Sequence, residues 1–121
     1  AGTTCLGEIA TPLGPVLPAE ASRHAIGRYH RPYGARVVQF LELLGLSTEQ
    51  HDEQLALARD HLSQQTQPEV IYGLSPHAPY SVRPPLYRAL VELAQIHDCP
   101  LAIHLAETQA ELQLLAEGRG E

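Results

Sequence analysis

Apolar residues along this chain gather in short runs that are separated by longer stretches of mixed polarity. Runs of about five to seven residues that are rich in apolar or β-prone side chains, bounded by polar residues, glycine or proline, are typical of strands. Four runs of this kind predict strands at Thr3–Ile9, Ala35–Phe40, Glu69–Leu74 and Leu101–Leu105. The pattern therefore predicts a sheet whose strands are spread over the whole chain.

Apolar residues at helical spacing follow three of these runs. Ser47 and Thr108 each stand three residues before a Gln or Glu, which predicts a capping box at the start of a helix, and Gly118 is a suitable helix end. A third helix is predicted between the helices that begin at Ser47 and Thr108, and Pro84 and Pro85 are tolerated in its first turn. The buried stripes are predicted to be Leu55, Ala58 and Leu62; Leu86, Leu90, Leu93 and Ala94; and Leu112 and Leu115. The proline- and glycine-rich segment 11–34 predicts a long connection, with a short helix near Glu20–Tyr29.

Strands that alternate with helices predict a parallel sheet with helices packed outside it. Val37, Val70 and Leu101 hold equivalent places in the pattern and stand 33 and 31 residues apart. A (β/α)8 TIM barrel of ~250 residues has about 31 residues per unit, so this chain has room for about four units. We therefore expect an α/β fold in which residues 1–121 form one partial TIM-barrel domain. A complete, small, doubly wound α/β domain is the alternative.

Composition excludes some classes of function. The net charge of −6 argues against a nucleic-acid-binding module, which needs a basic face. No apolar run approaches the ~20 residues that a membrane span needs. Cys5 and Cys99 form no CxxC motif, so we expect no disulfide framework and a cytoplasmic location.

Candidate chemistry stands at the predicted strand ends, where active sites of parallel sheets lie. Glu8 ends the first strand and is a candidate for substrate binding. His77 follows the third strand in the sequence SPHAPY, where neighbouring prolines restrict the backbone; a solvent-facing loop histidine is the alternative. Glu42 ranks lower, because its leucine-rich surroundings suit a helix start, and Tyr80 is expected to pack.

His104 and Glu107 form the most informative pair. An imidazole at a strand end and a carboxylate three residues later could share a metal-bound water, from which the carboxylate could take a proton. The alternatives are a buried core histidine and a carboxylate that only benefits from a helix N-terminus. The other histidines are predicted to lie on the surface: His24, His30, His51, His61 and His97.

Three sequence motifs together resemble the metal-dependent amidohydrolase superfamily. They are PHAPYS at 76–81, IHLAET at 103–108 and, more weakly, GTTCLGEIAT at 2–11. The similar branch includes cytosine, guanine and S-adenosylhomocysteine deaminase-like enzymes and triazine chlorohydrolases. The resemblance implies a distorted barrel with one divalent metal, zinc or iron. His104 would then be a metal ligand, Glu107 the catalytic proton shuttle, and His77 a substrate contact.

The chain departs from this family in its ligand set. The family needs an HxH pair, a further histidine and an aspartate on other strands, and no HxH pair occurs here. The resemblance therefore implies a segment covering strands two to five of a hydrolase that acts on C–N bonds of a small cyclic molecule. We expect this segment alone to be inactive, to bind the metal weakly and to self-associate. A small α/β binding or scaffold domain without catalysis is the alternative.

Overall fold

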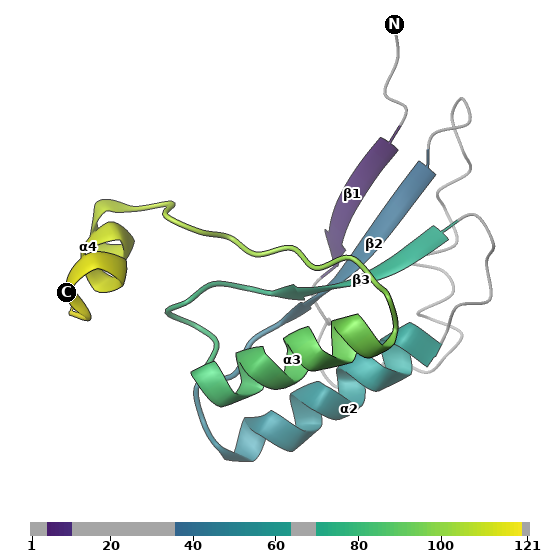
Figure 1. The fold of residues 1–121 in the computed structure, drawn as a ribbon, viewed down its shortest axis with the longest axis horizontal. Coiled ribbons are helices and arrows are strands. Elements are labelled where there is room, and N and C mark those ends of the chain that lie inside the picture. The colour runs from purple at the N-terminus through teal and green to yellow at the C-terminus, as the bar shows by residue number, and fades with distance from the viewer. Residues whose placement is uncertain (1–4, 11–35, 64–69, 120–121) are drawn as a thin grey trace, which may run out of the picture.

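The described residues form a parallel sheet with helices against one of its faces (Figure 1). The computed structural model describes residues 5–10, 36–63 and 70–119. The elements, in chain order, are β1 (Cys5–Ala10), β2 (Arg36–Leu43), α2 (Glu49–Ser63), β3 (Val70–Pro76), α3 (Pro84–Ile96) and α4 (Gln109–Glu117). The helix expected near Glu20–Tyr29 lies outside the described residues. The predicted α/β order and parallel pairing are confirmed for the part of the chain that is described.

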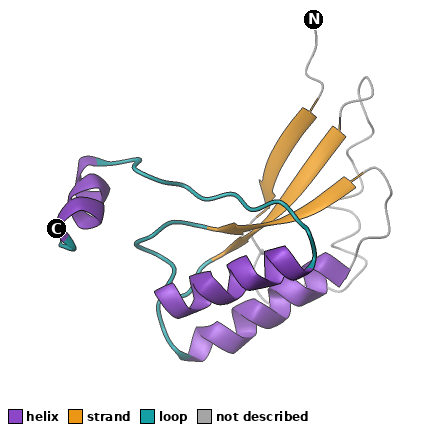
Figure 2. Ribbon diagram, in the orientation of Figure 1, coloured by secondary structure: helices purple, strands orange, loops and turns teal. Residues whose placement is uncertain are grey.

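The strands lie in the order β1-β2-β3, and both pairings are parallel. Because side chains alternate along a strand, the register assigns each residue to a face. Leu41 pairs with Leu74, and both belong to the layer that contacts the helices. Glu42 pairs with Ser75 and therefore lies on the opposite, open face of the sheet. Figure 2 shows α2 and α3 side by side beneath one face only.

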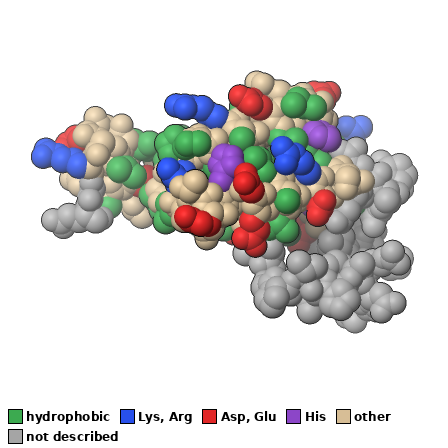
Figure 3. All heavy atoms as spheres, turned by 90° about the horizontal axis from the view of Figure 1, so that it is seen from below, with side chains coloured by type: hydrophobic (Ala, Val, Ile, Leu, Met, Phe, Trp, Pro, Cys, Tyr) green, Lys and Arg blue, Asp and Glu red, His purple; other side chains and the backbone are tan. Residues whose placement is uncertain are grey.

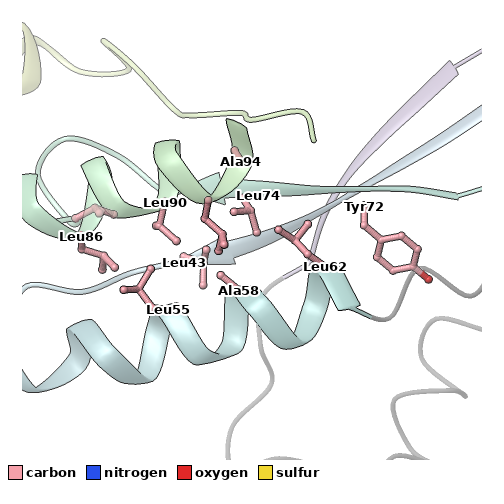
Figure 4. Close-up of a cluster of buried hydrophobic side chains, with 11 residues drawn as sticks. Leu43, Leu55, Ala58, Leu62, Tyr72, Leu74, Leu86, Leu90 and Ala94 are labelled. Atoms are coloured by element: carbon pink, nitrogen blue, oxygen red, sulfur yellow. The ribbon is translucent and has the colours of Figure 1, made fainter. Parts of the chain in front are cut away.

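One hydrophobic core lies between the sheet and these helices (Figure 4). It contains the stripes predicted for α2 and α3, which are confirmed as buried. The members are Leu43, Leu55, Ala58, Leu62, Tyr72, Leu74, Val82, Leu86, Leu90, Leu93 and Ala94. Each fully buried leucine contributes about 1.5–3 kcal/mol relative to an exposed one, so this layer fixes how α2 and α3 sit on the sheet. The outer surface of the helices carries interspersed acidic and basic side chains (Figure 3).

Hydrogen bonds at the helix ends support both predicted caps. Ser47 Oγ accepts from the Gln50 amide at 3.3 Å, and the Gln50 side chain accepts from the Ser47 amide at 3.2 Å. Thr108 Oγ1 accepts from the Glu111 amide at 3.1 Å, and Gly118 ends α4 with a φ of 67°. Both ends of α4 are thus set by the residues that flank it in the chain, Thr108 and Gly118.

Three predictions are wrong in detail. The run Leu101–Leu105 does not form a strand but a single bridge, Leu74↔Leu101, because Pro76 and Pro100 have no N–H with which to continue the ladder on either side of it. The stripe predicted for α4 is exposed, with Leu112 and Leu115 at 44% and 48%, because α4 stands apart from the sheet (Figure 1). The region of Glu42 does not start a helix, since β2 continues to Leu43.

Among the described helices, none is both long and apolar enough to cross a membrane.

Candidate functional site

Three potential ligand residues meet beyond the carboxyl end of the sheet. Glu42 stands near the end of β2, His77 directly follows β3, and His104 follows the bridge at Leu101. One ligand atom from each of these three side chains lies within 4.8 Å of the others, and all three residues are half-buried. We call Glu42, His77 and His104 the donor cluster. The sequence predicts that candidate chemical groups gather at the strand ends, and these three side chains do lie together there.

Backbone hydrogen bonds hold the donor cluster in place. The His77 N–H donates to the Leu43 carbonyl at 3.0 Å, and the His104 N–H donates to the His77 carbonyl at 2.9 Å. The cluster is therefore built on backbone that continues the sheet pairing past the last strand residues. Beneath it, Ser75 is the register partner of Glu42; it is fully buried, and its hydroxyl has no hydrogen-bond partner among the described residues.

His104 lies between two carboxylates. Its Nδ1 is 3.3 Å from Glu107 Oε1, and its Nε2 is 4.0 Å from Glu42 Oε1. The Glu42 side chain is only 14% exposed, whereas that of Glu107 is 49% exposed. A neutral imidazole carries one N–H and one lone pair, so it can donate to one neighbour and offer the other nitrogen to a cation. Glu107, the more accessible carboxylate, is the one that solvent and a substrate could reach.

A left-handed turn brings Glu107 back toward His104. Ala106 adopts a φ of 59°, which is unusual for a residue with a side chain. The Glu107 N–H then donates to Glu111 Oε2 at 2.8 Å, and Glu111 is only 2% exposed. The position of Glu107 is thus set by the turn on one side and by the first turn of α4 on the other.

His77 has contacts of its own. Its Nδ1 lies 2.7 Å from Ser81 Oγ, its ring meets the Tyr80 ring edge-on at 5.7 Å, and it lies 5.3 Å from the His104 ring. Sequence reasoning missed Ser81, although it is the last residue of the PHAPYS motif. Only the return of the loop, which the spacing of residues does not reveal, brings its hydroxyl to His77.

The loop after His77 is fastened to the end of β2. The Gly45 N–H donates to the Ser81 carbonyl at 3.0 Å, and the Arg83 N–H donates to the Gly45 carbonyl at 2.9 Å. A Cβ on Gly45 would come within 2.7 Å of Leu86 Cδ2, so a larger residue here would displace the buried Leu86 side chain. These hydrogen bonds therefore attach the loop to the same end of the sheet at which the donor cluster lies.

Glu8 lies elsewhere. It pairs with Gln39, three positions before the level of Glu42, and the alternation along the strand places it on the helix-facing side. It is not a member of the donor cluster. Its predicted role in substrate binding stays a prediction. Conversely, Glu42, which the sequence places below the other candidates, lies in the donor cluster, because its leucine-rich run is a strand in which every second residue faces away from the core.

The sequence predicts that His61 lies on the surface, but this residue is half-buried. Its Nε2 lies 3.3 Å from the Gln39 carbonyl, and its ring packs edge-on against Tyr72 at 5.2 Å. Burial lowers the pKa of His61 below its ordinary value, and the contact with the Gln39 carbonyl opposes this only in part. His97 is exposed and His51 half-buried, while His24 and His30 lie outside the described residues.

Comparison with known proteins finds similarity to deaminases over part of the chain. No family model matches. The aminodeoxyfutalosine deaminase of Deinococcus radiodurans is 37% identical over 84 residues, which are 67% of this chain and 20% of that protein. The 5-methylthioadenosine/S-adenosylhomocysteine deaminase of Halothermothrix orenii is 41% identical over 48 residues, which are 40% of this chain and 11% of that protein. The chain thus spans a fifth or less of the curated relatives it matches.

Solved structures give the same result. The aminofutalosine deaminase of Helicobacter pylori superposes with a TM-score of 0.61 at 28% identity, over 72% of this chain and 22% of that one. An adenosine deaminase from Xanthomonas campestris with bound zinc superposes with a TM-score of 0.63 at 23% identity, over 98% of this chain and 26% of that one. At this lower identity the second match shows the shared fold alone.

Proposed function

We propose that this chain, which belongs with the deaminases of the amidohydrolase superfamily as its motifs predicted, forms part of the active site of a metal-dependent deaminase. One observation carries the proposal. His77, His104 and Glu107, which the motifs single out, come together at the carboxyl end of the sheet, and Glu42 joins them. The substrate would be a small cyclic molecule that bears an amino group, such as an aminopurine or aminopyrimidine.

The proposed architecture is a partial TIM barrel that occupies residues 1–121. The parallel pairing, the repeat of 33 and 31 residues and the placement of helices on one face all support this. The open face of the sheet would then be the barrel interior, and the donor cluster would stand at the barrel's catalytic end. The alternative of a scaffold domain without catalysis is disfavoured, since the relatives found are deaminases.

The donor cluster is of a chemical kind that suits a divalent metal. It offers imidazole nitrogen and carboxylate oxygen, which zinc and iron both accept, and the buried hydroxyl of Ser75, the register partner of Glu42, has no hydrogen-bond partner among the described residues. His104 would hold the ion, with Glu42 as a further donor, since its Oε1 lies 4.0 Å from His104 Nε2. When bound, the ion would act as a Lewis acid that makes hydroxide available from water near neutral pH. This chain alone supplies too few ligands for tight binding, so we expect an affinity for zinc no better than micromolar.

Glu107 would move the proton. Its Oε1 lies 3.3 Å from His104 Nδ1, so its carboxylate adjoins the residue that would hold the ion. The carboxylate would take the proton as the water oxygen bonds to the carbon that bears the amino group. It would then give that proton to the amine nitrogen as the C–N bond breaks. His77 would stabilise negative charge that develops on the substrate.

Two substitutions in an active protein that contains this segment test the proposal. Glu107→Gln should lower kcat by about 10²–10⁴ with metal content retained, because glutamine keeps the size of the side chain but cannot carry the proton. His104→Ala should lose metal as well as activity. Metal analysis and ammonia release from a panel of aminopurine and aminopyrimidine compounds provide the measurements.

Glu92→Gln is the matched control, because Glu92 is an exposed glutamate on α3. It should leave both kcat and metal content unchanged. A Glu107→Gln protein with the original kcat would show that Glu107 is only a helix-end charge, and the proposed proton transfer would be wrong.

A further inference from the structure

We infer that Ser81 is a positioning residue that keeps the proton of neutral His77 on Nε2, so that His77 faces the donor cluster as a hydrogen-bond donor. The inference begins with the contact between Ser81 Oγ and His77 Nδ1, which is 2.7 Å long. A serine hydroxyl has one proton, so it either donates to Nδ1 or accepts from an N–H at that atom. The surroundings of Ser81 decide between these two arrangements.

The Ala78 carbonyl is the other group that could receive the Ser81 proton, at 3.2 Å from Oγ. That oxygen already accepts from the backbone N–H groups of Ser81 and Val82, both at 3.1 Å. A carbonyl oxygen has two lone pairs, so both are already in use. The Ser81 proton is therefore better placed on the shorter contact, which is the 2.7 Å contact to Nδ1. His77 Nδ1 is then the acceptor, and the ring proton resides on Nε2.

Ser81 has little freedom to change partner. It is only 8% exposed, and its carbonyl is held by the Gly45 N–H at 3.0 Å. The His77 backbone is fixed on both sides, by Leu43 and by His104. Donor and acceptor are thus both fastened to the end of the sheet, so the hydrogen bond biases the tautomer and the orientation of the ring together.

The tautomer decides whether His77 can act as a metal ligand or as a hydrogen-bond donor. With Nδ1 occupied by Ser81, Nε2 is the nitrogen left for the donor cluster, in which one ligand atom each of His77, Glu42 and His104 lies within 4.8 Å of the others. A nitrogen that carries a proton cannot offer a lone pair to a cation. His77 is then not a metal ligand, and the substrate atom that it meets is an acceptor, such as a ring nitrogen or an oxygen that gains negative charge. This last step rests on the proposed function, whereas the tautomer itself does not.

The experiment measures the tautomer in the 121-residue chain by NMR of ¹⁵N-labelled histidine rings, at about pH 8, where an ordinary imidazole is neutral. A His77→Gln sample identifies the signals of His77 among the other histidines. The unmodified chain should carry the His77 proton on Nε2. A proton found mainly on Nδ1 would overturn the inference, whatever the catalytic activity of the full protein.

Substitution of Ser81 provides the second arm. Ser81→Ala should shift the tautomer ratio of His77 toward Nδ1–H by about threefold to tenfold, the size expected for one neutral hydrogen bond. Ser81→Thr keeps the hydroxyl and should restore the ratio. Ser63→Ala is the matched control, because Ser63 is an exposed serine at the end of α2, and it should change nothing. An unchanged ratio in Ser81→Ala would overturn the inference. If a variant does not fold, the tautomer measured in the unmodified chain still decides between the two arrangements.

Discussion

His61 shows what burial does to a single titratable residue. Its ring is packed against Tyr72, and its pKa is lowered because water is excluded from the protonated form. Protons therefore bind more strongly to His61 in the unfolded chain than in the folded chain. The free energy of unfolding that this residue contributes is fully present above its ordinary pKa of about 6.5 and is lost as pH falls from there through the lower folded value.

We therefore predict that His61→Gln reduces the loss of stability on acidification. Urea unfolding at about pH 7.5 and pH 5.5, on either side of the ordinary histidine pKa, should show a larger drop for the unmodified chain than for the variant. His97→Gln is the control, since His97 is exposed, and its drop should equal that of the unmodified chain. Equal drops for all three proteins would contradict the assignment of this pH dependence to His61.

The candidate site residues that can be predicted from the sequence are those whose place in the fold follows from their position after a predicted strand. His77, His104 and Glu107 follow apolar runs, and strand ends meet at one edge of a parallel sheet. Ser81 and the burial of His61 depend instead on how a loop returns and on what packs against a helix end. Those contacts join parts of the chain whose relative placement is not encoded in local spacing.

Phe40 of β2 shows how neighbouring strands accommodate one large ring. Gly7 of β1 and Gly73 of β3 lie on either side of it, and a Cβ on Gly7 would meet the ring at an ordinary 3.4 Å. A Cβ on Gly73 would come within 2.7 Å of the ring and 2.8 Å of the Pro100 carbonyl. The backbone at Pro100 cannot retreat easily, since its carbonyl accepts from the Leu74 N–H.

We predict that Gly73→Ala destabilises the chain by about 1–3 kcal/mol through overpacking, and that Gly7→Ala costs clearly less. The two substitutions add the same methyl group beside the same phenylalanine, so Gly7→Ala is a matched control. Midpoints of urea unfolding provide the comparison. Similar midpoints for the two variants would contradict the close approach at Gly73.

Elements were predictable where both partners of an interface lie within the described chain. The stripes of α2 and α3 match their burial, because the sheet that covers them is present. The stripe of α4 has the same kind of pattern, yet it is exposed. Periodicity shows which face of an element is apolar, but not whether a neighbour exists to cover it.

At the scale of the whole molecule, the described helices that pack on the sheet cover one of its faces only. The helices occupy one face, while Ile9 and Ile71 on the other face are 40% and 44% exposed (Figure 2). Exposed apolar surface of this kind favours association. We keep the expectation from the sequence that this chain associates with itself, and the open face is the surface that we assign to it.

We predict that Ile71→Ser reduces self-association of the chain, measured as average mass by light scattering over a range of concentrations. Ile96→Ser is the control, because Ile96 is 79% exposed but stands at the end of α3, away from the open face. It should leave the average mass unchanged. A monomer at every concentration, or equal effects of both substitutions, would be evidence against association through this face.

The left-handed turn at Ala106 has an evolutionary consequence. A side chain at a φ of 59° costs about 1–2 kcal/mol that glycine would not incur. Glycine would also let the chain between His104 and Glu107 visit many more conformations, so the carboxylate would spend less time beside the imidazole. The alanine therefore exchanges some thermodynamic robustness for a well-ordered carboxylate. If stability alone were selected, glycine would be favoured at this position.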